Sequence, residues 1–156
     1  MNDYQIAYSY WEQSVCRANR CFDRSHTLLA LFYYQQAIQR SDVLLEANPA
    51  SRQSIGAMLV SHHNLAELYQ RNGAYRAAWQ HFQAARLKMH DILQTCGSLP
   101  GPLWGSRIAY TQLCLFEEQH GTFGASKSGE HSPAKSRTLS PTVSQVFPLT
   151  QQSTTH

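Results

Sequence analysis

The sequence predicts an all-α fold: a short α-solenoid of about five helices in antiparallel hairpins, followed by a disordered C-terminal tail. Three observations predict it. Apolar residues recur at three- and four-residue spacing in five segments. Glycine, proline or asparagine lies at three of the four junctions between these segments. Part of the pattern also repeats at an offset of 48, which relates Ala30, Tyr34 and Ala37 to Ala78, Phe82 and Ala85.

The first helix is predicted over residues 4–22 by an aromatic-rich apolar stripe, which we expect to be core rather than a ligand site. Its register is irregular: at an offset of 48, Arg17 and Arg20 stand where Leu65 and Leu68 stand. We therefore expect this helix to be shifted by a few residues, with a longer loop after Phe22. The stripe consists of Tyr4, Tyr8, Trp11, Val15, Ala18 and Phe22.

The second and third helices are predicted over residues 25–46 and 51–72. Residues 23–26 offer candidate N-caps for the second helix. Pro49 cannot continue that helix, and Ser51 is placed to cap the third. Ile55, Leu59, Leu65 and Leu68 give the third helix its buried face.

The fourth and fifth helices are predicted over residues 74–94 and 102–119. Gly73 stops the third helix, because glycine accepts the left-handed conformation of a C-terminal cap. Pro102 suits the first turn of the fifth helix. The offset of 48 relates Leu65 to Leu113 and Gly73 to Gly121, so the last helix is half of a repeat and a candidate cap for the stack.

The chain divides into a helical domain, residues 1–125, and a tail, residues 126–156. The tail holds twelve serines and threonines and three prolines, a composition typical of disorder. Its one apolar cluster is Val146-Phe147-Pro148-Leu149. We hypothesise that this cluster docks on the open end of the solenoid.

Eight residues between positions 65 and 85 carry a family resemblance. They follow the order of the tetratricopeptide repeat, a 34-residue helix-turn-helix unit. The phrase from Asn64 to Tyr75 resembles the long-repeat variety typified by kinesin light chains. His62 departs from the pattern, since the family often has Trp there, and a period of 48 is longer than the usual repeat. The repeat-signature residues are Leu65, Ala66, Tyr69, Gly73, Tyr75, Ala78, Phe82 and Ala85.

The resemblance implies that the first helix of each hairpin lines a concave face that binds a peptide or a partner helix. In the middle hairpin it implies the partner-binding residues His63, Asn64, Glu67, Gln70 and Arg71. The alternative is that these residues form a solvated face. A clamp for a C-terminal carboxylate is not expected, because the cations that it needs are missing.

The amino-acid composition limits the classes of partner that we expect for this protein. Residues 1–125 carry ten Lys and Arg against nine Asp and Glu, and no helix carries a basic stripe. We therefore do not expect this chain to bind nucleic acid. No apolar run is long enough to span a membrane, and no secretory signal is recognisable. We therefore expect a cytoplasmic protein whose four cysteines are free thiols.

No motif predicts catalysis, a metal or a cofactor. His62 and His63 are adjacent and point in different directions on a helix, and no H-x-x-x-H or C-x-x-C pair occurs. No phosphate loop or dinucleotide fingerprint is present. The sequence thus favours a non-catalytic scaffold or adaptor that binds another protein. The alternatives are a self-associating structural protein that forms a homodimer by helix stacking, and a ligand- or peptide-sensing regulatory protein.

Overall fold

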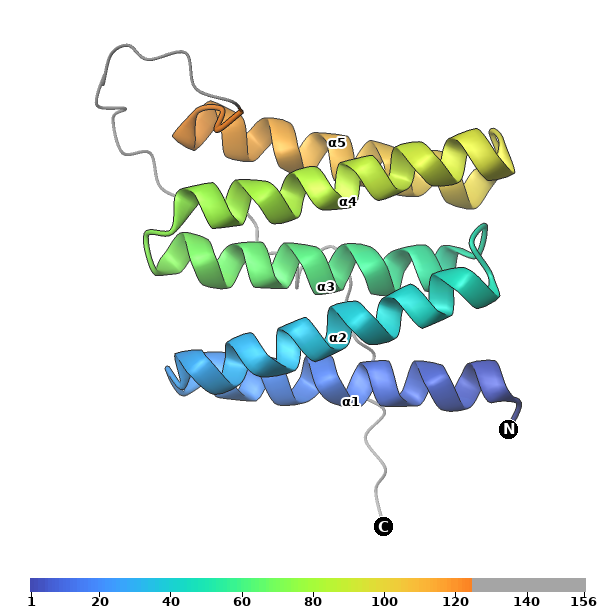
Figure 1. Ribbon diagram of the computed structural model, residues 1–156, viewed down its shortest axis with the longest axis horizontal. Coiled ribbons are helices and arrows are strands. Elements are labelled where there is room, and N and C mark those ends of the chain that lie inside the picture. The colour runs from blue at the N-terminus through green and yellow to red at the C-terminus, as the bar shows by residue number, and fades with distance from the viewer. Residues whose placement is uncertain (125–156) are drawn as a thin grey trace, which may run out of the picture.

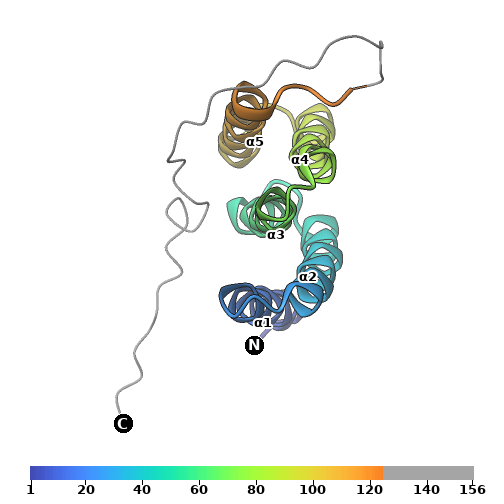
Figure 2. The same ribbon diagram turned by 90° about the vertical axis from the view of Figure 1, so that its left-hand side faces the viewer.

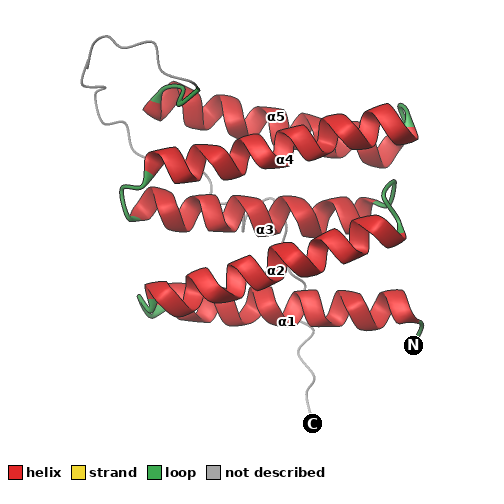
Figure 3. Cartoon of the chain, viewed as in Figure 1, coloured by secondary structure: helices red, strands yellow, loops and turns green. Residues whose placement is uncertain are grey.

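The five apolar segments are five helices in the computed structural model, which describes residues 1–124. This part of the chain contains no strand, so it is all-α as predicted (Figure 3). The predicted ends agree to within two residues, and the predicted tail lies outside the described residues. The helices are α1 (Asp3–Asp23), α2 (Thr27–Ala47), α3 (Arg52–Arg71), α4 (Tyr75–Cys96) and α5 (Pro100–His120).

The helices form two layers. Consecutive helices run antiparallel and pack against each other (Figure 1). Figure 2 shows α1, α3 and α5 in one layer and α2 and α4 in the other. Helix α3 lies at the centre, because it contacts all four other helices. No described helix has the length and apolarity that crossing a membrane requires.

The period of 48 extends to the turn after α1. Ser25 has φ 60°, Gly73 has φ 73° and Gly121 has φ 80°, so a left-handed residue ends each first helix at this spacing. The backbone hydrogen bonds repeat as well: His26 N–H donates to Cys21 O at 2.8 Å, and Ala74 N–H donates to Tyr69 O at 2.9 Å. The predicted shift and longer loop in the first hairpin are therefore wrong.

Packing explains why Arg17 and Arg20 broke the sequence pattern. Their counterparts Leu65 and Leu68 are buried against the preceding hairpin, in a cluster with Ala18, Ala30 and Tyr34. No hairpin precedes α1 in the described chain, and both arginines are exposed there. The register is the same in both hairpins and only the environment of these two positions differs.

The core carries most of the repeat-signature residues. Leu65, Ala66, Ala78, Phe82 and Ala85 are buried at the junctions of the helices. The small alanines let the backbones approach while Phe82 fills the space between α3, α4 and α5. Three signature positions differ from this pattern, since Tyr69 is partly buried, Gly73 is exposed in the turn and Tyr75 is 40 % exposed.

Helix α5 packs very closely on the middle hairpin. A Cβ atom built on Gly105 would lie 2.4 Å from Ile55 Cγ2 and 2.9 Å from Met89 Sδ. A side chain at this position would collide with both neighbours, so glycine is what permits the approach. The helix begins at Pro100 rather than at the predicted Pro102.

Local capping matches the sequence in one place and differs in another. Ser51 Oγ accepts hydrogen bonds from the backbone N–H groups of Gln53 and Ser54, as predicted. The N-cap of α2 is His26, which makes no side-chain capping bond. The candidate cap Ser25 adopts the left-handed turn conformation instead.

Candidate functional site

The layer formed by α1, α3 and α5 presents one side-chain stripe from each helix. On α3 the stripe is Gln53, Gly56, Val60, Asn64 and Glu67, which recur at three- and four-residue spacing. Gly56, Val60 and Glu67 are partly exposed although most of α3 is buried. This stripe is therefore the side of the central helix that its neighbours leave accessible.

The period of 48 extends the stripe into rows across the three helices. Tyr8, Gly56 and Trp104 occupy equivalent positions on α1, α3 and α5, and all three are partly exposed. The next row is Glu12, Val60 and Ile108. We call these six residues, together with Glu67, the first-helix face.

The apolar members of this face are fixed by the core beneath them. Tyr8 and Val60 pack against the cluster that contains Trp11 and Leu44. Trp104 and Ile108 pack against a second cluster around Ile55 and Met89, and the guanidinium of Arg52 lies 4.4 Å above the Trp104 ring. The aromatic rings are thus held in place rather than freely mobile on the surface.

Two of the predicted partner-binding residues, Asn64 and Arg71, connect α3 to α1, and a third, Glu67, pairs within α3. Asn64 Nδ2 donates a hydrogen bond to Asn19 Oδ1 at 3.4 Å. Glu67 and Arg71 form an ion pair at 3.0 Å, with side chains 22 % and 59 % exposed. The Arg71 guanidinium also lies 4.4 Å above the ring of Phe22. Arg71 is therefore the most accessible of the predicted residues but is already paired.

Gln70 connects α3 to α5. Its Nε2 lies 3.1 Å from Nε2 of His120, and the His120 ring stacks on Tyr75 at 4.3 Å between centroids. Burial lowers the pKa of His120, which favours the neutral ring that can accept a hydrogen bond from Gln70.

Two of the predicted residues do not offer an accessible side chain. His63 is 0 % exposed and packs on Phe82 at 5.3 Å between ring centroids, so the expectation that it lies on an open face is wrong. Asn64 is 7 % exposed, and its amide is used by Asn19. Successive side chains on a helix point in different directions, and His63 therefore points toward α4 while its neighbour points toward α1.

The residues that sequence reasoning missed are Tyr8, Gly56, Val60, Trp104 and Ile108. The sequence pattern assigned Tyr8 only to the apolar stripe of the first helix. Gly56 has no side chain, so it contributes nothing to such a pattern. The available signal was the offset of 48, which aligns Tyr8 with Gly56 and Gly56 with Trp104.

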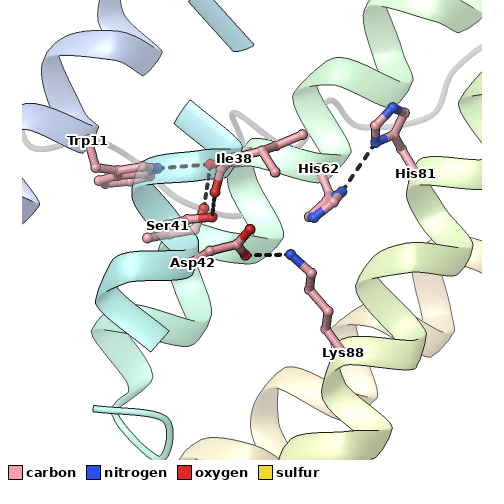
Figure 4. A network of polar contacts seen from close by, with 9 residues as sticks. Trp11, Ile38, Ser41, Asp42, His62, His81 and Lys88 are labelled. Atoms are coloured by element: carbon pink, nitrogen blue, oxygen red, sulfur yellow. Dashed lines mark hydrogen bonds and ion pairs between the residues drawn. The ribbon is translucent and has the colours of Figure 1, made fainter. Parts of the chain in front are cut away.

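Three histidines lie between α3 and α4. His62 Nδ1 and His81 Nδ1 are 3.2 Å apart (Figure 4). The His81 ring also stacks on Tyr69. Figure 4 also shows the nearby ion pair between Asp42 of α2 and Lys88 of α4. Burial lowers the pKa of His62 to about 3 and the pKa of His63 to about 4, so both rings are neutral at neutral pH.

Within the described part of the chain, the buried ring nitrogens of this histidine cluster are largely without hydrogen-bond partners. Among the described residues, no hydrogen-bond partner reaches His62 Nε2 or either ring nitrogen of His63. Within residues 1–124, no three His, Cys, Asp or Glu side chains gather as a set of metal ligands. The four cysteines are unpaired thiols, each partly buried.

Comparison with known proteins gives one family. Searches against curated proteins and against solved structures find no match. A family model matches residues 9–131, a range that includes all five helices except the first turns of α1. The chain belongs to the family described as "Protein of unknown function (DUF2753)".

Proposed function

We propose that this chain is a non-catalytic protein-interaction module of the tetratricopeptide type, which binds a peptide or a partner helix on its first-helix face. One observation carries the proposal: Tyr8, Gly56 and Trp104 form a partly exposed row across three parallel first helices. Partly exposed aromatic side chains held by a core are typical of binding surfaces.

The chemistry of the face suits a polypeptide ligand. Gly56 has no side chain, so a bound segment can approach the α3 backbone between the two aromatic residues. Val60 and Ile108 provide apolar contact in the adjacent row, and Glu12 provides a charge at its edge. Apolar contacts surrounded by polar groups are the usual composition of a protein interface. The proposal requires no cofactor, metal or nucleic acid, and it takes the module to act in the cytoplasm.

The test uses two substitutions at one position. Gly56→Arg places a long charged side chain on the centre of the face, whereas Gly56→Ala adds one methyl group. We expect affinity capture from the native cell extract to recover a partner with the wild type and with Gly56→Ala, but not with Gly56→Arg. Helical circular dichroism checks that all three chains are folded. Equal capture by a folded Gly56→Arg variant would remove this face from the proposal.

A second candidate is self-association through the outer side of the first hairpin. Ile6, Tyr10 and Val43 are 40 %, 53 % and 54 % exposed there. A hollow of about 280 Å³ on the same side is lined by Ala7, Tyr10, Arg40 and Val43. Exposed apolar side chains that adjoin one another favour an interface. Sedimentation at several concentrations tests it, and a monomer at every concentration excludes it.

A further inference from the structure

Within residues 1–124, α5 is a first helix with no second helix of its own packed on it. Its outward side carries Leu103, Arg107, Tyr110, Thr111, Cys114 and Glu118, which we call the open face of α5. The counterparts of this face on α3, one period earlier, include Ile55, Leu59, His62, His63 and Ala66, and all five are buried. The counterparts on α1 include Trp11, Ser14, Val15 and Ala18, and these are buried as well.

The second helices are what bury these positions. In the middle hairpin, Ala85 and Met89 of α4 cover Ile55 and Leu59, and Phe82 covers His63. On α5 the equivalent surface is accessible, with Leu103 38 % exposed and Tyr110 62 % exposed. The open face of α5 is therefore equivalent to the surfaces of α1 and α3 on which a second helix packs. Within the described residues, no second helix packs on this face of α5.

The path of the chain after α5 leads toward the missing element. Gly121 has a positive φ, 80°, at the position equivalent to Ser25 and Gly73, although its ψ of 178° and the hydrogen bond from its N–H to Glu117 O differ from the two earlier turns. Phe123 then lies 6.2 Å from Phe116 between ring centroids, and Arg76 Nη1 donates to Phe123 O at 3.2 Å. The segment after α5 accordingly crosses toward α4 in the other layer (Figure 2).

The tail residues that lie one period of 48 after α4 do not have the apolar side chains that a second helix would need to pack on α5. One period after the buried face of α4, the sequence has Ser126, Glu130, Pro133, Arg137 and Ser140. They are polar or, at Pro133, incompatible with a helix interior. The apolar cluster that follows Gly124 in the sequence is Val146-Phe147-Pro148-Leu149, and positions 125–145 lie between them.

The chain between Gly124 and this cluster is long enough for docking. Fully extended, it reaches about 70 Å, whereas α5 is roughly 32 Å long. A tethered segment also has an effective concentration in the millimolar range, so a weak apolar contact suffices. We propose that residues 146–149 dock on the open face of α5, with Phe147 against Tyr110 and beside Cys114.

Cys114 provides the test, because its thiol lies on the open face and is partly exposed. The full chain is prepared with Cys16, Cys21 and Cys96 replaced by serine, and the rate of Cys114 alkylation by iodoacetamide is measured. We expect Phe147→Ser to raise this rate several-fold. The matched control Leu139→Ser removes an apolar tail residue outside the cluster and is expected to leave the rate unchanged. Circular dichroism confirms that the chains are equally helical.

The outcomes are distinct. An increase with Phe147→Ser that does not depend on protein concentration supports docking within one chain. Equal rates for Phe147→Ser, Leu139→Ser and the parent chain overturn the proposal. Protection that disappears on dilution of the parent chain assigns the open face to a second copy and also overturns it.

Discussion

Trp11 of α1 donates its indole N–H to Ser61 Oγ of α3 at 2.8 Å, and both side chains are buried. The Ser61 hydroxyl donates in turn to Ala57 O at 2.7 Å. This bond joins the first helices of two hairpins through the core and fixes their relative position.

Ser61→Ala is expected to lower the free energy of unfolding by about 1–3 kcal/mol, because it leaves the buried indole N–H without an acceptor. Urea unfolding followed by circular dichroism measures the change. Trp11→Phe in the Ser61→Ala background should cost less than Trp11→Phe in the wild type, since the polar group has already lost its partner. Additive effects in this double-mutant cycle would contradict the assignment.

The turns predict opposite effects for two substitutions at equivalent positions. Ser25→Gly should raise the free energy of unfolding by about 1 kcal/mol, because Ser25 has φ 60° and glycine adopts this conformation without strain. Gly73→Ala should lower it by a similar amount, since Gly73 has φ 73°. Thermal unfolding of both variants measures the pair, and shifts of the same sign would rule out the shared turn geometry.

Gly105→Ala is expected to destabilise the fold by about 1–3 kcal/mol through overpacking. The new methyl group would collide with Ile55 Cγ2. Ile55→Ala removes that carbon, so the cost of Gly105→Ala should be smaller in the Ile55→Ala chain. Chemical denaturation of the wild type, the two single variants and the double variant measures these costs. If Gly105→Ala lowers the free energy of unfolding equally in both backgrounds, the new methyl group does not collide with Ile55.

The buried histidines predict a loss of stability in mild acid. The unfolded chain binds protons at His62 and His63 near pH 6.5, whereas burial lowers their folded pKa values to about 3 and about 4. The neutral rings therefore contribute stability that is fully present above pH 6.5. Below it, each ring lowers the free energy of unfolding by about 1.4 kcal/mol per pH unit until its folded pKa is reached.

His63→Phe separates this contribution from that of the carboxyl groups. We expect the difference in unfolding free energy between pH 7 and pH 5 to be smaller in this variant than in the wild type. His90 is exposed, so His90→Gln serves as the control and should leave the difference unchanged. An identical pH dependence in all three chains would show that His63 does not titrate on unfolding.

The helices were predictable because their signals are local. The three- and four-residue spacing of apolar side chains, Gly73 and Pro49 each act within a few residues of chain. The prediction of a shifted register in the first hairpin was wrong for a different reason. Arg17 and Arg20 occupy the positions of Leu65 and Leu68 in the same register, but the two leucines are buried by the preceding hairpin whereas the two arginines are exposed.

The candidate site was less predictable than the fold. The sequence pointed to the first helix of the middle hairpin, which is α3, and among the residues predicted there Glu67 and Arg71 have side chains 22 % and 59 % exposed. It placed His63 on that side as well, although His63 is covered by Phe82. Gly56 and Val60 were overlooked, because a glycine and a valine within a helix have no pattern that distinguishes an exposed position from a buried one.

The sequence by itself determined where the helices begin and end and that the unit repeats with a period of 48, because capping, turn geometry and periodicity are set by short-range interactions. The tertiary structure decided which sides of those helices remain accessible. Helix α3 is contacted by all four other helices, and α5 packs on it closely enough to require glycine at position 105. Exposure at Gly56 and burial at His63 follow from that packing, which depends on residues distant in the chain.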